Sequence, residues 1–126
     1  MLSLLLDSWI LGISLSRGFR LHYTNIWDFS DLSGQDLTGS IPPEIGNLSH
    51  LESLNLSSNS LVGSIPNTFV KLSQLSVLKL CDNKLEGPLP KFLPELKSLR
   101  SLYLCNNLFS ESIPPEIGGC PKLEFL

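Results

Sequence analysis

The sequence of 126 residues contains no alanine, although 28 of its residues are leucine. Alanine has the highest intrinsic helix propensity, so its absence argues against an ordinary bundle of α-helices. Positive charge is also scarce, because nine Lys and Arg stand against twelve Asp and Glu, for a net charge of -3. A chain of this charge offers no basic face to nucleic acid or to an anionic membrane. We therefore expect neither as a direct partner.

The motifs of catalysis and cofactor binding are missing as well. The sequence has no GxGxxG, GxxxxGK, GxSxG or HExxH, the signatures of phosphate-binding loops, nucleophile elbows and zinc helices. His22 and His50 have no Cys or carboxylate at ligand spacing. Glu44 and Glu116 recur within IPPEIG, but three strand spacings of ~5 Å separate them, which exceeds the separation that glycosidases use. We expect no enzymatic activity, no cofactor and no metal site.

No apolar run is long enough to span a bilayer. Residues 1–16, MLSLLLDSWILGISLS, fall short of the ~20 residues that a spanning helix needs. Their length and the small Ser14 and Ser16 fit a secretory signal peptide. Asp7 and the lack of a preceding Lys or Arg fit instead a hydrophobic N-terminal lid or the remnant of an altered reading frame, and both interpretations stay open. Residues 17–26 are predicted to form an irregular N-terminal segment.

A repeating unit of about 24 residues organises the rest of the chain, and an internal period of this length indicates a solenoid. Successive copies read LESLNLSSNSLVGSIPNTFVKLSQ from Leu51, LSVLKLCDNKLEGPLPKFLPELKS from Leu75 and LRSLYLCNNLFSESIPPEIGGCPK from Leu99. An earlier copy begins at Trp27, and the pattern restarts at Leu123. We assign residues 27–126 to four repeats and the start of a fifth.

Each repeat divides into a strand and a return segment. The LxxLxL spacing predicts short strands at 53–57, 77–81 and 101–105, with the leucines on one buried face. Asn59, Asn83 and Asn107, with Gln35 in the first copy, are expected to hydrogen-bond backbone groups between the leucines. The recurring Gly and Pro of the second half favour an extended, turned or 3₁₀-like return over an α-helix.

The segments NSLVGSIP, NKLEGPLP and QDLTGSIPPEIGNLSHLESLNLSSN resemble the plant-type extracellular leucine-rich repeat, LxxLxxLxLxxNxLxGxIPxxLxxL. The resemblance implies a leucine-rich-repeat solenoid: a right-handed α/β-type horseshoe with a parallel sheet on the concave face and little regular helix. Three features depart from the pattern. Ser30 replaces a strand leucine, Glu111 replaces a glycine, and no cysteine pair precedes Trp27.

The resemblance also implies a function. Such repeats form the ectodomains of receptor-like kinases and receptor-like proteins, so we expect a non-catalytic module that recognises a protein or peptide ligand, with or without a co-receptor, in signal perception or defence. It would be secreted or lie on the extracellular side of the plasma membrane, and would meet the membrane only through a longer parent chain. The alternatives are a secreted inhibitor of microbial cell-wall-degrading enzymes, and a fragment without independent function, which the stop at Leu126 within a repeat favours.

Binding residues are expected at the solvent positions of the strands, because packing occupies the other columns. A solenoid presents these positions as a regular concave surface. The variation in charge, size and aromaticity favours recognition over a merely hydrophilic sheet face, and Tyr103 beside Arg100 is the expected anchor. The candidate residues are Glu52, Ser53, Asn55, Val77, Lys79, Arg100 and Tyr103.

Two kinds of covalent modification remain to be considered. The sequons Asn47-Leu48-Ser49 and Asn55-Leu56-Ser57 make Asn47 and Asn55 candidates for glycosylation, and a glycan on Asn55 would cover part of the strand face. Cys81 and Cys105 lie one repeat apart and should be neighbours on adjacent strands. A spacing of ~4.8 Å is near the short end of disulfide geometry. We therefore prefer two free thiols and keep a strained bridge as the alternative.

Overall fold

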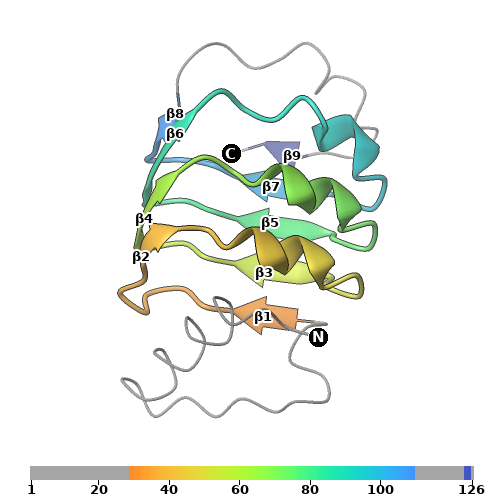
Figure 1. The fold of residues 1–126 in the computed structure, drawn as a ribbon, viewed down its shortest axis with the longest axis horizontal. Helices are drawn as coiled ribbons and strands as arrows, with labels where there is room; N and C mark the ends of the chain where they lie inside the picture. Colours follow the sequence, from red (N-terminus) through yellow and green to blue (C-terminus); the bar gives the residue numbers. More distant parts are fainter. Residues whose placement is uncertain (1–28, 110–123, 126) are drawn as a thin grey trace.

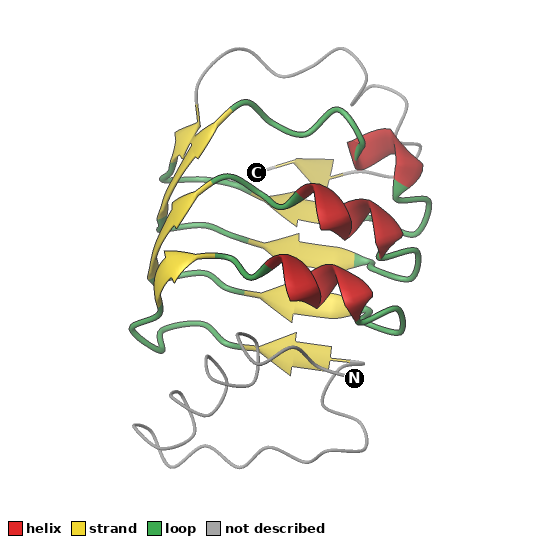
Figure 2. Cartoon of the chain, in the orientation of Figure 1, coloured by secondary structure: helices red, strands yellow, loops and turns green. Residues whose placement is uncertain are grey.

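The computed structural model describes residues 29–109 and 124–125 and shows a solenoid whose coils stack along one axis (Figure 1). Each complete coil adds a strand to each of two parallel sheets and a 3₁₀ helix on a third side, the 3₁₀ side (Figure 2). The first sheet has the order β1 (Phe29–Asp31), β3 (Ser53–Asn55), β5 (Val77–Lys79), β7 (Ser101–Tyr103), β9 (Glu124–Phe125). The second has β2 (Thr38–Ser40), β4 (Ser60–Gly63), β6 (Lys84–Gly87), β8 (Leu108–Phe109), and the 3₁₀ helices are η1 (Pro43–Asn47), η2 (Asn67–Lys71) and η3 (Leu93–Glu95). The interpretations of 1–16 and 17–26 lie outside the described residues.

The register of the first sheet follows the step of the sequence. Leu54 pairs with Leu78, and Leu78 with Leu102, and each is at most 2% exposed. The predicted buried stack of leucines is therefore confirmed. Ser30 pairs with Leu54, so it occupies the strand-leucine position from which the sequence departs. The strands begin where predicted but end two residues earlier.

Three residues after the end of β1, β3, β5 and β7, the backbone adopts a left-handed conformation. The residues concerned share one repeat position and have φ between 53° and 62°: Gly34, Ser58, Asp82 and Asn106. Glycine and short polar residues such as Asn and Asp adopt this conformation at the lowest cost, whereas bulky side chains rarely do. The polar residues after each LxxLxL motif thus set the corner between the two sheets.

The asparagine ladder, consisting of Asn59, Asn83 and Asn107, holds these corners together. The Asn83 Oδ1 accepts the N–H of Leu61 in the preceding coil at 3.0 Å, while its Nδ2 donates to three carbonyls, the nearest that of Leu56 at 2.9 Å. Asn107 does the same one coil further on. The predicted hydrogen-bonding role is confirmed for all three. Gln35 differs, because its Nε2 donates to Ser33 and its Oε1 has no partner among the described residues.

The second sheet is more regular than the sequence suggested. Val62 pairs with Lys84, and Gly63 with Leu85, so the register of this sheet falls two residues short of the repeat step. The offset keeps each side chain on its own face of the sheet, since strand side chains alternate with period two. Gly39, Gly63 and Gly87 leave this sheet with φ between 77° and 84°, which favours glycine.

The core is a column of leucines closed on the 3₁₀ side by larger groups. Phe69 in η2 is fully buried, and Ile45 of η1 is 2% exposed. η1 and η2 come close because Gly46 has no side chain: a Cβ there would overlap the backbone oxygen of Thr68. The Thr68 hydroxyl in turn donates to the Pro43 carbonyl at 2.6 Å. Packing thus uses three sides of each coil and leaves the outer face of the first sheet to solvent.

Candidate partner-binding face

The solvent side of the first sheet has three rows of side chains that run along the solenoid axis. We call this surface the strand strip. One row is Ser53, Val77 and Ser101; the next is Asp31, Asn55, Lys79 and Tyr103; the third, just before the strands, is Glu52, Ser76 and Arg100. Strand residues of the strip alternate with buried leucines, so the pleat turns them to solvent. Every binding residue predicted from the sequence lies on this one surface.

Lys79 and Tyr103 form the clearest side-chain pair on the strip. They are register partners on β5 and β7, and the Lys79 Nζ lies 5.4 Å from the centroid of the Tyr103 ring. A cation within about 6 Å of a ring face is attracted by the ring quadrupole. The structure thus gives Tyr103 a Lys79 neighbour, whereas the sequence suggested Arg100. The ammonium group is held near the middle of the strip.

Asp31 belongs to the same row but was missed by the sequence analysis. Its Oδ1 accepts the Ser33 N–H at 3.1 Å and the Ser33 hydroxyl at 2.7 Å. Asn55, one repeat on, accepts the Ser57 N–H at 3.0 Å in the same way. Counting back one repeat from Asn55 would have identified Asp31. Both side chains close the turn after their strand, and Asp31 remains exposed.

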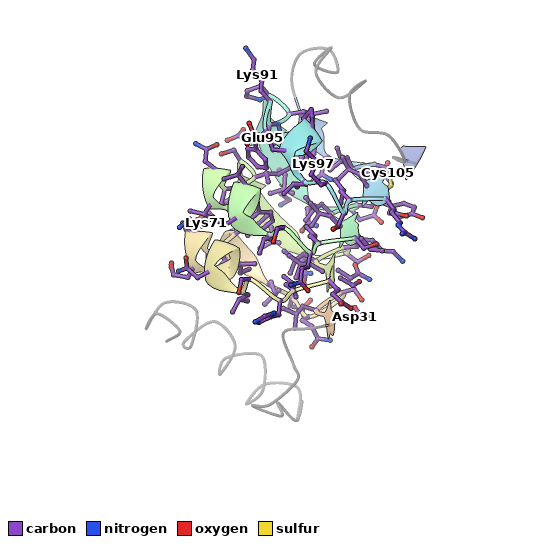
Figure 3. The ribbon with its side chains drawn as sticks, turned by 90° about the vertical axis from the view of Figure 1, so that its right-hand side faces the viewer. Asp31, Lys71, Lys91, Glu95, Lys97 and Cys105 are labelled. Atoms are coloured by element: carbon purple, nitrogen blue, oxygen red, sulfur yellow. A yellow bond between two sulfur atoms is a disulfide. The ribbon has the colours of Figure 1, made fainter. Side chains whose placement is uncertain are left out.

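The end of the strip towards the second sheet contains a disulfide between Cys81 and Cys105 (Figure 3). The preference for two free thiols was wrong. The Cα atoms lie 4.6 Å apart, inside the range of about 4.4–6.8 Å that disulfides span, because the parallel register places the two residues side by side. Cys81 is 9% exposed, whereas Cys105 is open to solvent. The bridge ties the third coil to the fourth at the edge of the strip.

The two candidate glycosylation sites occupy different surroundings. Asn47 is exposed at the end of η1, on the side opposite the first sheet. Asn55 is half-buried on β3, with its Oδ1 engaged by Ser57. A glycan on Asn47 would extend from the 3₁₀ side, while one on Asn55 would stand on the strip. Glycosylation of either residue stays a prediction.

Other chemistry is sparse in the part of the chain that the structure describes. Residues 29–109 and 124–125 contain no group of three or more His, Cys, Asp or Glu side chains that could hold a metal ion. Within the same ranges, no helix has the length and apolar character required to cross a bilayer.

Comparison with known proteins identifies the family. Family models described as leucine rich repeat match residues 31–85 and 98–120. The chain therefore belongs to the leucine-rich-repeat family, and its fold is the leucine-rich-repeat solenoid that the sequence predicted. A comparison with curated proteins gives no match.

Similar solved structures come from plant receptors of Arabidopsis thaliana. The ectodomain of the membrane receptor kinase GASSHO1/SCHENGEN3, in complex with CASPARIAN STRIP INTEGRITY FACTOR 2, is 47% identical with a TM-score of 0.72 over 75% of this chain and 12% of its own. The chain matched in the BIR3–SERK2 complex is 43% identical with a TM-score of 0.67, over 75% of this chain and 55% of that chain. The matched chain in the complex of the receptor kinase HAESA with the peptide hormone IDA and the co-receptor SERK1 is 44% identical with a TM-score of 0.67. The match covers 71% of this chain and 15% of that chain.

These proportions set the scale of the comparison. The chain spans 12% of the GASSHO1/SCHENGEN3 ectodomain and 55% of the chain matched in the BIR3–SERK2 complex. Its fold is the one that these receptor ectodomains use, and ectodomains of membrane receptors are extracellular. The family fold is a scaffold for binding, built from stacked coils that present a regular surface.

Proposed function

We propose that this chain is a non-catalytic recognition module of a plant receptor ectodomain, and that it binds a protein or peptide ligand on the strand strip outside the cell. The main observation in support is the strip itself, where charged, aromatic and small polar side chains lie in register on one sheet. Packing needs none of them, because the buried leucines alternate with them. Tyr and Arg, which are enriched in binding hot spots, both lie on it at β7.

The relatives support the class of partner. One of the similar ectodomains is in complex with CASPARIAN STRIP INTEGRITY FACTOR 2, and another with a peptide hormone and a co-receptor. Since this chain spans a small part of those receptors, its strip would form one portion of a longer binding surface. Partners of the present chain would accordingly be an extracellular peptide, a co-receptor ectodomain, or both, with signal perception as the outcome.

Size argues that binding by this chain alone is weak. The five described strands of the first sheet at ~4.8 Å spacing span about 19 Å, and the three strand positions with the one before them span about 13 Å at ~3.3 Å each, which gives a projected area of about 250 Å². A standard interface buries about 800 Å² per partner. Affinity does not follow area strictly, but few positions are available for a desolvated hot spot. We expect dissociation constants in the micromolar range or weaker.

A selection experiment tests the proposal. The full chain is immobilised and used to select binders from a displayed library of random linear decapeptides, and the binders are then measured against variants. Tyr103→Ala and Arg100→Ala are expected to weaken binding at least fivefold. Lys91→Ala and Lys97→Ala, which change exposed residues at the η3 side, serve as matched controls and should leave it unchanged.

The opposite pattern of binding among these variants would contradict the proposal. Binding that survives both strip variants and is lost in the Lys91 or Lys97 variant would place the functional face on the 3₁₀ side and overturn the proposal. The same four variants, tested against a purified cell-wall-degrading enzyme, examine the alternative of a secreted inhibitor. Inhibition by this chain that depends on Tyr103 would favour that alternative.

A further inference from the structure

Within residues 29–109 the charges are separated along the solenoid axis. Residues 29–70 contain four carboxylates, those of Asp31, Asp36, Glu44 and Glu52, and no Lys or Arg. Residues 71–109 contain six cations and three carboxylates. Nothing in the repeat consensus requires this order, because the charged residues stand at variable positions. Within residues 29–109, the first two coils and the next two therefore carry opposite net charge.

The strand strip shows the separation in its simplest form. Its acidic side chains, Asp31 and Glu52, are exposed at β1 and at the start of β3. Its basic side chains, Lys79 and Arg100, lie on β5 and at the start of β7. The other strip residues of the second and third coils are uncharged: Ser53, Asn55, Ser76 and Val77. From β1 to β7 the sign of the strip thus changes once, between β3 and β5; the next strand of the sheet, β9, contains Glu124.

Neighbouring groups preserve this order. The Asp82 carboxylate lies near the basic end, but it follows the strand in the left-handed corner and accepts a hydrogen bond from the Asn106 Nδ2 at 2.7 Å. The Lys79 ammonium is held near the strip surface by the Tyr103 ring. At the other end, the Asp31 Oδ1 accepts two hydrogen bonds from Ser33, which fixes the side chain, and Oδ2 accepts none from the described residues.

The spacing of the two ends sets the spacing of complementary groups in a ligand. Two strand steps separate Asp31 from Lys79, and two separate Glu52 from Arg100, which at ~4.8 Å per step is about 10 Å. A peptide in the extended polyproline II conformation rises ~3.1 Å per residue, so about three residues span the same distance. Because this conformation has three residues per turn, a basic side chain and an acidic group at positions i and i+3 lie on one face of the peptide and would face the two ends together.

We propose that the strand strip selects a peptide in the extended polyproline II conformation that lies along the solenoid axis and has a basic side chain and a carboxylate about three residues apart. The basic group lies over Asp31 and Glu52, and the carboxylate over Lys79 and Arg100. The proposal rests on the proposed function and adds the chemistry of the ligand to it. Exposed ion pairs of this kind contribute modestly to affinity but strongly to the choice of partner and its orientation.

The peptide selection described above provides the test when it is done at low ionic strength and its sequences are read. We expect enrichment of Lys or Arg three residues from Asp or Glu, relative to the unselected library. Selection on the double variant Asp31→Asn/Glu52→Gln should lose the basic preference and keep the acidic one. Selection on Lys79→Gln/Arg100→Gln should do the reverse.

The chain offers well-matched isosteres and controls. Asp31→Asn preserves the turn, because Asn55 already makes the same bond to Ser57 one coil on. Lys84→Gln/Glu86→Gln removes one charge of each sign from exposed positions on β6 of the second sheet, and should keep both preferences. Thermal melting of each variant establishes that it is folded.

A synthetic peptide from the selection then gives magnitudes. Replacing its basic residue by norleucine should weaken binding about two- to fivefold, and this loss should vanish in the Asp31→Asn/Glu52→Gln variant. A matching peptide whose carboxylate is its own C-terminus, compared with an amidated one bearing Asp, distinguishes the two sources of the acidic group; binding of either supports the proposal. Raising the salt to about 0.5 M should reduce binding, because the Debye length then falls to about 4 Å.

Failure of this inference differs from failure of the proposed function. If the selected peptides depend on Tyr103 and Arg100 but show no paired charges, or if each double variant abolishes both preferences, the charge-order inference is wrong and the binding face stands. If the peptides bind regardless of Tyr103→Ala and Arg100→Ala, the binding face itself is wrong.

Discussion

Replacing Asn83 by alanine tests the physical basis of the repeat. Asn83 is 8% exposed and is the one buried polar residue among the described side chains. It makes four hydrogen bonds: its Oδ1 accepts from Leu61, and its Nδ2 donates to the carbonyls of Leu56, Leu80 and Cys81. A simple count would assign the substitution the loss of all four.

Hydrogen bonds from neighbouring residues make the expected loss of stability smaller. The Leu56 carbonyl also accepts from Asn59, the Leu80 carbonyl from Asn107, and the Cys81 carbonyl from the Ser58 N–H. Each carbonyl therefore keeps a partner after the substitution. The Leu61 N–H loses its acceptor inside the core, and one unpaired buried group costs about 1–3 kcal/mol. We expect Asn83→Ala to lower the free energy of unfolding by that amount.

Urea denaturation of the chain and its variants measures the difference. Asp82→Asn is the matched control, because the exposed Asp82 has φ 59°, which Asn tolerates, and the acceptor for Asn106 is retained. It should stay within about 0.5 kcal/mol of the parent chain, as surface changes usually do. Equal losses of unfolding free energy in the two variants would refute the reasoning. An Asn83→Ala loss about four times that of one unpaired buried group would refute it as well.

Three further predictions concern packing and the disulfide. Leu78→Ala should lower the free energy of unfolding, measured by urea denaturation, by about 2–5 kcal/mol, because Leu78 is 1% exposed in the central coil. Lys84→Ala on the surface should be near neutral, and similar losses for the two variants would contradict the stacked core. Gly46→Ala should cost roughly 1–3 kcal/mol, since its Cβ would overlap the Thr68 backbone, and a melting temperature equal to that of the Ser49→Ala control would contradict this contact. Cys81→Ser/Cys105→Ser introduces at both positions the serine that Ser57 supplies one coil earlier. Because the disulfide closes a loop of 24 residues, its loss should lower the free energy of unfolding by about 3 kcal/mol. An unchanged urea midpoint would contradict a bridge in the folded chain.

Much of the fold followed from the constant step of the repeat alone. Columns of leucine at LxxLxL positions fixed both the strands and their register, because a shift of one residue would expose every leucine. The Asn column was also predictable, since a polar residue between buried leucines needs hydrogen-bond partners. The first sheet and the ladder are therefore readable without coordinates.

The second sheet and the disulfide were harder to predict, for different reasons. In the second sheet the partners, such as Val62 and Lys84, fall two residues short of the repeat step, so the columns of the sequence do not align them. The disulfide could not be decided from strand spacing, because the ~4.8 Å estimate and the observed Cα separation of 4.6 Å both lie inside the range that allows a bridge without requiring one. On the strip, the residues were predictable from alternation, but the placement of Lys79 over Tyr103 required side-chain geometry.

Photo-crosslinking tests the central claim, that the strand strip is the binding face. A photoreactive phenylalanine analogue is placed at Val77 or Ser101 on the strip, and at Lys71 or Lys91 away from it (Figure 3). After illumination with a peptide obtained by selection on the unmodified chain, mass spectrometry identifies the linked positions. We expect crosslinks from Val77 and Ser101, with none from the other two positions. Crosslinks from Lys71 or Lys91, together with none from the strip, would contradict the account.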